Sequence, residues 1–240
     1  MQVIYEPAGR AREFAALAAN LYRGCAHGCL YCYAPQVIKL KREEFVAGAR
    51  PRENVLKYLE KDARRFRGDD REILLSLTSD PYQPLETALG LTRRAIEILI
   101  ENELRFAILT KAGRRASRDF DLMSRYPRCR FGTTLIFTLE TDAQKWEPAA
   151  ASIAERIRSL RTAHQNGIRT WVSLEPVIDA AQALSLIKRL HPIVGQWNIG
   201  RLNYRRPDRA VDWIAFRKEA LELLDGLGAD YCMKKSLTEL

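Results

Sequence analysis

Three cysteines lie within eight residues near the start of the chain, in the run Cys25-Ala-His-Gly-Cys29-Leu-Tyr-Cys32. Cysteine thiolates are the usual ligands of iron–sulfur clusters, and a fully ligated [4Fe-4S] cluster takes four of them. This run supplies three. A cluster short of one protein ligand leaves one iron open to a small molecule, as a catalytic zinc keeps an open position. The spacing therefore predicts a [4Fe-4S] cluster whose open iron chelates S-adenosylmethionine and passes it an electron.

Two other interpretations of the cysteines remain open at this point. The thiols could bind zinc together with His27 or a distant fourth ligand, or they could be free thiols in a loop. The aromatic side chain of Tyr31, directly before the last cysteine, favours the cluster. So does the setting of the loop, which follows an apolar segment at 14–21 and precedes a basic helix candidate.

The residues around the cysteines resemble those of a known superfamily. The stretches that carry the resemblance are Asn20-Leu21-Tyr22-Arg23-Gly24-Cys25, His27-Gly28-Cys29 and Tyr31-Cys32-Tyr33. They are similar to the radical SAM superfamily. Three later stretches are similar to its spore photoproduct lyase-like, or DNA repair photolyase, branch: Thr78-Ser79-Asp80-Pro81-Tyr82-Gln83-Pro84-Leu85-Glu86, Leu109-Thr110-Lys111 and Ser173-Leu174-Glu175-Pro176. The resemblance covers most of the chain, roughly residues 1–235.

Short apolar runs alternate with longer amphipathic ones along the chain, and this order predicts parallel βαβ units. The expected strands are one within 14–21, then 73–77, 105–109, 131–138, 168–174 and 196–199, with a short extended piece at 231–233. The expected helices are 53–67, 87–103, 118–125, one from Ser152 to Asn166-Gly167, 180–190 and 212–227. Six such units predict an α/β fold, a partial (β/α)6 TIM-type barrel, which is also the fold that the resemblance implies. We expect one radical SAM core domain over 1–240, with an N-terminal extension at 1–13 and a C-terminal tail at 229–240.

The composition is that of an ordinary globular protein, with 47% hydrophobic and 29% charged residues among 240. The sequence has no apolar run long enough to span a membrane and no secretory signal at its start. Five cysteines, three of them grouped as ligands, argue against a disulfide framework. A cytoplasmic protein without a membrane partner is therefore expected.

The net charge of +9 indicates a polyanionic partner, and nucleic acid is the usual one. The basic residues come in short groups: Lys39, Lys41 and Arg42; Arg64, Arg65 and Arg67; Arg114, Arg115 and Arg118; Arg205, Arg206 and Arg209; Lys234 and Lys235. The same groups are also typical of solvated helix faces and turns, so both interpretations stay open.

Active sites of α/β barrels lie on the loops that follow the strands. The pairs that end the expected strands are Ser79 and Asp80, Thr110 and Lys111, Thr138 and Glu140, Ser173 and Glu175, and Gly200 and Arg201. We expect cofactor-binding residues among them. The resemblance implies that Ser79 and Asp80 meet the ammonium group of S-adenosylmethionine, as a hydroxyl and a carboxylate can; a capping turn is the alternative.

Other roles are assigned to single residues. The resemblance implies that Tyr31 offers its backbone and ring to adenine and that Ser173 reaches the ribose. Gly200 would allow close approach of the backbone to adenine. Packing against the barrel mouth is the alternative for Tyr31, and a plain turn is the alternative for Gly200.

One departure from the branch concerns the return of a hydrogen atom to the product. Spore photoproduct lyase has a cysteine about two residues before its Ser-Asp pair, and this chain has Leu77 there. An aliphatic C–H bond cannot replace a thiol S–H, so repair by the same route is not expected. Tyr33 matches a tyrosine of the hydrogen-return path, and Cys232 is a candidate substitute donor. Cys129 is expected to be a small buried residue.

The function expected is that of a radical SAM enzyme, lyase-like. It would cleave S-adenosylmethionine reductively to methionine and a 5′-deoxyadenosyl radical, which abstracts a hydrogen atom from substrate, with a nucleic-acid base as the first candidate. An electron donor such as flavodoxin or ferredoxin is a required partner. One alternative is a radical SAM enzyme acting on a peptide or small metabolite. An alternative of another class is a non-enzymatic zinc or iron–sulfur module that docks on nucleic acid.

Overall fold

The computed structural model describes residues 2–202 and 211–239. Within these residues the main sheet has the order β1-β2-β5-β6-β7-β8-β9-β10, and β3 pairs with β4 in a small separate ribbon. The strands are β1 (Ile4–Tyr5), β2 (Leu17–Ala19), β3 (Tyr22–Arg23), β4 (Arg50–Pro51), β5 (Ile73–Leu75), β6 (Phe106–Thr110), β7 (Cys129–Thr134), β8 (Arg169–Val177), β9 (Gln196–Arg201) and β10 (Tyr231–Met233).

Every neighbouring pair from β2 to β10 is parallel, and only β1 joins β2 antiparallel among the described strands of this sheet. This arrangement confirms the predicted α/β architecture with a partial TIM-type barrel. The extension expected at 1–13 contributes strand β1, and the tail expected at 229–240 contributes strand β10 at the short extended piece predicted there, so both segments join the sheet.

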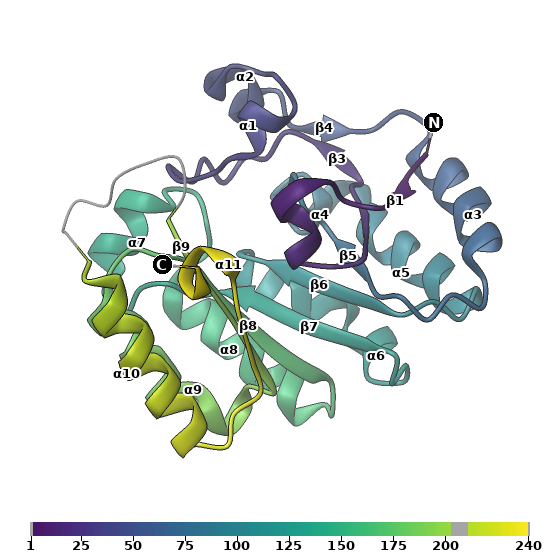
Figure 1. The fold of residues 1–240 in the computed structure, drawn as a ribbon. Helices are drawn as coiled ribbons and strands as arrows, with labels where there is room; N and C mark the ends of the chain where they lie inside the picture. The colour runs from purple at the N-terminus through teal and green to yellow at the C-terminus, as the bar shows by residue number, and fades with distance from the viewer. Residues whose placement is uncertain (1, 203–210, 240) are drawn as a thin grey trace.

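The helices lie mainly on the outer face of the sheet, as Figure 1 shows for α5, α6, α8 and α9. The helices are α1 (Ala34–Val37), α2 (Arg42–Ala47), α3 (Val55–Phe66), α4 (Glu86–Leu89), α5 (Leu91–Glu101), α6 (Phe120–Met123), α7 (Glu140–Trp146), α8 (Ile153–Gln165), α9 (Ala180–Leu190), α10 (Trp213–Gly226) and α11 (Lys235–Thr238). Short 3-10 turns are η1 (Gly9–Glu13), η2 (Gly113–Asp119) and η3 (His191–Ile193).

Local sequence explains where these helices begin and end. The Ser152 hydroxyl accepts a hydrogen bond from Glu155 N at 3.2 Å, so the predicted cap of α8 is confirmed. The helix expected over 87–103 is instead two helices, α4 and α5. Gly90 separates them with φ of 63°, a left-handed conformation that glycine adopts without steric cost.

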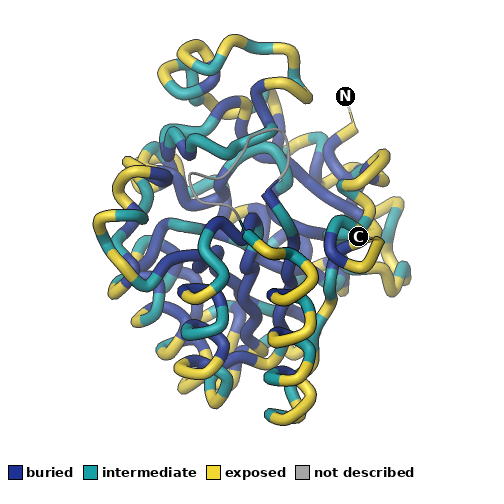
Figure 2. The backbone as a smooth tube through the Cα atoms, turned by 60° about the vertical axis from the view of Figure 1, so that its left-hand side comes forward, coloured by how far each residue is buried: buried dark blue, intermediate teal, exposed yellow. Residues whose placement is uncertain are grey.

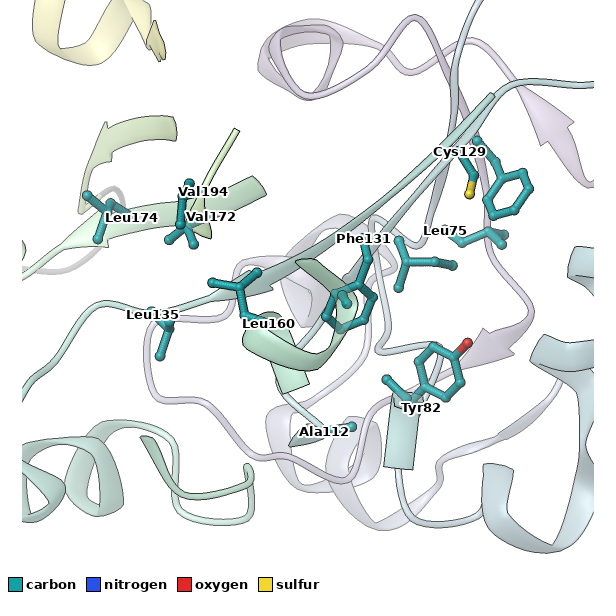
Figure 3. Packing of buried hydrophobic residues seen from close by; sticks show 14 of the residues in the cluster. Leu75, Tyr82, Ala112, Cys129, Phe131, Leu135, Leu160, Val172, Leu174 and Val194 are labelled. Carbon is teal, nitrogen blue, oxygen red and sulfur yellow. The ribbon is translucent and has the colours of Figure 1, made fainter. Parts of the chain in front are cut away.

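The core consists of two apolar clusters on opposite faces of the sheet. The larger one packs the sheet against the helices and extends from Val3 to Leu237, so a single core reaches both chain ends. Figure 2 shows the strands buried inside exposed outer helices, and Figure 3 shows Cys129 and Phe131 within this packing. Cys129 is 2% exposed, as the sequence predicts.

The smaller cluster fills the inside of the barrel. It contains Leu74, Ala107 and Trp171, with Phe14 among the side chains packed against them. Side chains of a strand alternate between the two faces. Since Trp171 faces inward, Ser173 and Glu175 of the same strand face inward above it.

No helix in the described residues is long and apolar enough to cross a membrane. The basic group formed by Arg205, Arg206 and Arg209 lies outside the described residues.

Candidate active site

A cavity of about 880 Å³ opens where the parallel strands end. Most of the residues expected at the site line it: Cys25, Cys29, Tyr31, Cys32, Tyr33, Ser79, Asp80, Ser173 and Glu175. The loops after β2, β5, β6 and β8 thus meet at one mouth, as the parallel topology requires. Lys111, Thr134, Arg201 and Lys234 also line the cavity.

The cysteine loop is held from several sides by groups distant in sequence. Cys25 N donates to Phe45 O at 3.1 Å, and Leu30 N donates to Trp146 O at 2.8 Å. Gly24 has φ of 83°, and a Cβ there would lie 2.5 Å from Phe45 O. Only glycine fits this close approach without moving the backbone, so the glycine before the first cysteine is needed to seat the loop.

Arg42 on α2 fixes the second half of the loop. Its guanidinium donates to Cys29 O at 2.7 Å, to Leu30 O at 2.9 Å and to Cys32 O at 3.3 Å. Charge-assisted hydrogen bonds are stronger than neutral ones. Arg42 therefore holds the backbone of two candidate ligands in one conformation and places a fixed positive charge beside them.

The buried thiols favour their protonated form unless a cationic group binds them. Burial raises the pKa of Cys29 well above its ordinary value; nearby Lys111 opposes this, and Glu147, Cys25 and Cys32 add to it. A group of positive irons would reverse this preference, because a coordinating thiol is deprotonated outright. Among the described residues no three His, Cys, Asp or Glu side chains converge as the ligands of a metal ion do. The thiolates of a [4Fe-4S] cube bind separate irons, so they do not have to converge on one point.

His27 does not offer a free nitrogen to a metal. It is 1% exposed, with Nδ1 3.3 Å from Asp80 Oδ2 and Nε2 3.3 Å from Arg115 Nη2. Burial lowers the pKa of His27, but the Asp80 carboxylate outweighs burial and raises it to about 9. Nδ1 faces Asp80, and Nε2 faces the Arg115 guanidinium, from which it can accept only in the neutral ring because arginine has donors alone. Both nitrogens are thus covered by protein groups, which argues against a zinc site that uses His27 as fourth ligand.

The carboxylate of Asp80 is hydrogen-bonded to protein groups on both of its oxygens. Its Oδ1 accepts from Tyr82 N at 2.8 Å and from Thr110 Oγ1 at 2.7 Å. Its Oδ2 accepts from Lys111 N at 2.7 Å and faces His27. Burial raises the pKa of Asp80, but His27 and these donors together hold it well below its usual range.

A carboxylate has about four acceptor sites, and all four are in use in Asp80. Asp80 thus ties the loops after β2, β5 and β6 together, and its contact with an ammonium group stays a prediction. The neighbouring hydroxyl is the better candidate. Ser79 Oγ is buried and has no hydrogen-bond partner among the described residues.

A buried polar chain lies behind Tyr31. The Tyr31 hydroxyl donates to Glu147 Oε1, and Glu147 Oε2 pairs with Arg156, which is 2% exposed. Arg156 donates to Ala151 O at 2.8 Å as well. Lys111 Nζ lies 5.5 Å from the centre of the Tyr31 ring. The chain anchors the tyrosine of the cysteine loop to α8 and leaves its ring at the cavity wall.

Tyr33 lies beside the position where the branch has its cysteine. The Tyr33 hydroxyl donates to Leu77 O at 3.1 Å, and both residues line the cavity. Cys232 lies elsewhere. It is exposed on β10 and is not among the residues that line the cavity. A hydrogen donor must touch the product, so this placement does not support Cys232 in that role.

Gly200 does not reach the cavity, because the carboxyl group of Glu175 fills the space beside it. A Cβ on Gly200 would lie 2.4 Å from Glu175 Oε1. Close approach of this glycine is therefore to a side chain of the neighbouring strand, and Gly200 is not among the residues that line the cavity. Ser173 is 1% exposed and lines the cavity.

Thr138 and Glu140 also differ from expectation. Strand β7 ends at Thr134, four residues earlier than predicted, so the following segment leaves the sheet. Thr138 N donates to Gln182 Oε1 at 2.7 Å, and Glu140 Oε2 accepts from Ile153 N at 3.0 Å. Neither lines the cavity. Both instead join the helices beside the barrel.

Sequence comparison gives two curated relatives of uncharacterised function. One, from Methanocaldococcus jannaschii, is 30% identical over 161 residues, which are 66% of this chain and 59% of the relative. The other, from Acidianus two-tailed virus, is 27% identical over 172 residues, 67% of this chain and 55% of the relative. The matches thus span less than two thirds of the length of either relative.

Structure comparison finds the same fold in solved enzymes. A spore photoproduct lyase variant with bound S-adenosylmethionine and dinucleoside spore photoproduct has a TM-score of 0.74 at 13% identity, covering 95% of this chain and 78% of the lyase. Streptococcus suis SuiB bound to S-adenosylmethionine has a TM-score of 0.64 at 10% identity, covering 90% and 45%. At sequence identities this low, the similarity to these structures shows a shared fold alone.

The family comparison covers the site directly. The family model of the radical SAM superfamily matches residues 19–178, which include the cysteine loop and strands β3 to β8. Such a domain implies a [4Fe-4S] cluster and S-adenosylmethionine, in agreement with the three thiols at the barrel mouth. The chain belongs to the radical SAM superfamily.

Proposed function

We propose that the protein is a radical SAM enzyme that abstracts a hydrogen atom from a nucleic-acid base. The observation that carries the proposal is the convergence of three thiols, an unpartnered serine hydroxyl and an accessible tyrosine ring on one cavity. In this proposal Cys25, Cys29 and Cys32 hold the cluster. Ser79 meets the methionine ammonium, and Tyr31 lies against the adenosine.

When bound, the reduced cluster supplies one electron that splits S-adenosylmethionine into methionine and a 5′-deoxyadenosyl radical, which takes a hydrogen atom from the substrate. The protein contributes placement and shielding. Arg42 fixes the loop that carries two ligands, and Asp80 fixes the loops around it. Apolar side chains of Leu77 and Leu109 line the cavity and limit water there.

A nucleic-acid substrate is supported by the charge and by the form of the site. The chain has a net charge of +9, and phosphate contacts supply much of the affinity of nucleic-acid binding. Exposed basic residues on the segments that flank the cysteine loop or pair with them include Arg23, Lys39, Lys41 and Arg50. Enzymes that act on a base draw it into a pocket, and the cavity offers apolar walls for such a ring.

Anaerobic reconstitution with iron and sulfide tests the proposal. We expect a brown protein with about four irons per chain, which forms 5′-deoxyadenosine from S-adenosylmethionine under dithionite. Alanine at any of the three cysteines should abolish both properties, and Cys129→Ala is the matched control that should keep them. A colourless protein that retains zinc would contradict the proposal and support the zinc module.

Nucleic-acid binding is tested separately on the reconstituted protein. Affinity for single-stranded and duplex DNA should fall steeply as salt is raised from about 50 to about 200 mM. If affinity for DNA and RNA is negligible at low salt while 5′-deoxyadenosine still forms, the substrate is of another class, such as a peptide or a small metabolite.

A further inference from the structure

The two ends of the chain together build one side of the cavity wall. Lys234 Nζ donates to Glu13 O and lies 4.0 Å from the centre of the Phe14 ring. Lys235 N donates to Glu13 Oε2 at 3.0 Å. These contacts join η1 to the segment after β10, which lie together at the open side of the barrel (Figure 1). The radical chemistry proposed above leaves this side of the wall without a role.

The cavity also has an apolar floor. Phe14, Leu74, Leu77 and Leu109 line it and belong to the cluster around Trp171 inside the barrel. Ligand pockets typically combine such apolar walls with a few polar groups that fix orientation. A floor of this kind suits the face of a planar ring, and specificity then depends on the polar groups at its edge.

Glu175 is the polar group at that edge whose bonding is incomplete. Its Oε1 lies against Gly200, while its Oε2 is buried and has no hydrogen-bond partner among the described residues. Buried polar atoms are nearly always paired, so an exception calls for an explanation. Burial raises the pKa of Glu175 to about 7; Lys234 opposes this, and Glu13 adds to it.

The charged groups around Glu175 come from three elements. Lys234 follows β10, Glu13 ends η1 and Arg201 ends β9, and all three line the same cavity. Arg201 N donates to Ser236 Oγ at 3.2 Å. The edge of the cavity therefore presents an acceptor at Glu175 on the same lining as Lys234, whose ammonium group is bound to Glu13 O. A ligand edge with an N–H is complementary to this acceptor.

We propose that Glu175 recognises the substrate, accepting a hydrogen bond from a ring or exocyclic N–H at the edge of a nucleobase stacked on the apolar floor. This inference rests on the proposed function and adds the residue that reads the base. The sequence analysis expected Glu175 to bind the cofactor, and this inference assigns it to the substrate instead. Carboxylates are suitable acceptors for such edges, as in contacts of Glu and Asp with the cytosine amino group.

Nucleoside binding to the reconstituted enzyme with S-adenosylmethionine tests the inference. The probes are the four deoxynucleosides, with thymidine paired to N3-methylthymidine, which lacks the ring N–H. Dissociation constants are measured by saturation-transfer NMR for wild type, Glu175→Ala and the surface control Glu101→Ala. Binding is measured at about pH 8, above the pKa of Glu175 of about 7, where the carboxylate can accept. Loss of a hydrogen bond to a charged group should then weaken binding about 10- to 100-fold in Glu175→Ala. The control should bind as wild type does.

Gly200→Ala is a second variant that keeps the carboxyl group but displaces it, since the added methyl would lie 2.4 Å from Oε1. It should weaken nucleoside binding too. Formation of 5′-deoxyadenosine under dithionite is measured in every sample. It should remain at the wild-type level in the control Glu101→Ala, and in the two site variants it distinguishes a substrate role of Glu175 from a cofactor role.

The outcomes separate the two proposals. The inference is overturned if wild type and Glu175→Ala bind equally, or if wild type binds none of the deoxynucleosides. If 5′-deoxyadenosine still forms in those samples, the proposed radical chemistry stands without the inference. Loss of 5′-deoxyadenosine formation in Glu175→Ala returns Glu175 to the cofactor and also overturns the inference. If wild type forms no 5′-deoxyadenosine, the proposed function fails and the inference fails with it.

Discussion

Replacing Glu147 by glutamine removes the counter-charge of a buried arginine while keeping the shape of the side chain. Glu147 and Arg156 are each 2% exposed, and the same carboxylate accepts the hydroxyl of Tyr31. Breaking a buried ion pair by neutralising one partner costs about 3–5 kcal/mol, because the remaining charge is left uncompensated. For a chain of this size each kcal/mol lowers the melting temperature by about 2–4 °C. We therefore expect Glu147→Gln to melt about 6–20 °C below wild type.

The matched control is Glu60→Gln on the surface of α3. Glu60 pairs with Arg64 one helical turn away, and both side chains are at least half exposed. Such pairs contribute about 0.3–0.5 kcal/mol, so this variant should melt within about 2 °C of wild type. The assay is thermal unfolding followed by circular dichroism, under anaerobic conditions, with and without reconstituted cluster. Equal melting temperatures for Glu147→Gln and Glu60→Gln would refute the claim that the buried chain holds the cysteine loop.

Three further predictions concern the cysteine loop, the carboxyl group of Glu175 and the interior of the barrel. Arg42→Gln should lose iron faster during gel filtration than the exposed neighbour variant Lys41→Gln, and an equal rate would show that the three carbonyl contacts do not hold the loop. Because burial raises the pKa of Glu175 to about 7, the folded state retains a proton that the unfolded chain loses near pH ~4.3. Wild-type stability relative to Glu175→Gln should thus be greatest below about pH 4 and fall by up to about 4 kcal/mol as pH rises to about 7; parallel urea midpoints across this range would contradict it. Gly132→Ala places a methyl 2.4 Å from a tryptophan ring of β8 and should lose about 1–3 kcal/mol, whereas Gly226→Ala, with nothing within 4 Å, should not.

Some elements were predictable from sequence because their signals are local. Helix α9 has the predicted bounds, Ala180–Leu190, and α8 has the predicted cap and a glycine with φ of 73° at its end. The short strands β1, β3 and β4 were missed. Each has two residues, too few for an alternating pattern to appear. Their positions depend on pairing with distant segments.

In the candidate site, too, local signals were predictable from sequence and contacts between distant segments were not. Cysteine spacing is a local signal, and it predicted which thiols share the cavity. The surroundings of Asp80 could not be predicted in this way, because its partner Thr110 lies 30 positions away and the imidazole of His27 is further still. Arg42 and Glu147 carry no motif that would single them out. Their roles come from the contacts that the folded chain makes with the cysteine loop.

The unpaired polar atoms of the molecule indicate where a ligand is expected. Six buried side-chain atoms in the described residues have no hydrogen-bond partner: Ser76 Oγ, Ser79 Oγ, Arg128 Nε, Glu175 Oε2, Trp197 Nε1 and Asn198 Oδ1. Ser76, Ser79 and Glu175 line the cavity, and Asn198 lies on β9 opposite Ser173. A fold assembled for stability alone would pair such groups, since each unpaired one costs about 1–3 kcal/mol. In the two proposals above, a ligand completes the bonding of two of these atoms: the methionine ammonium at Ser79 and a base edge at Glu175.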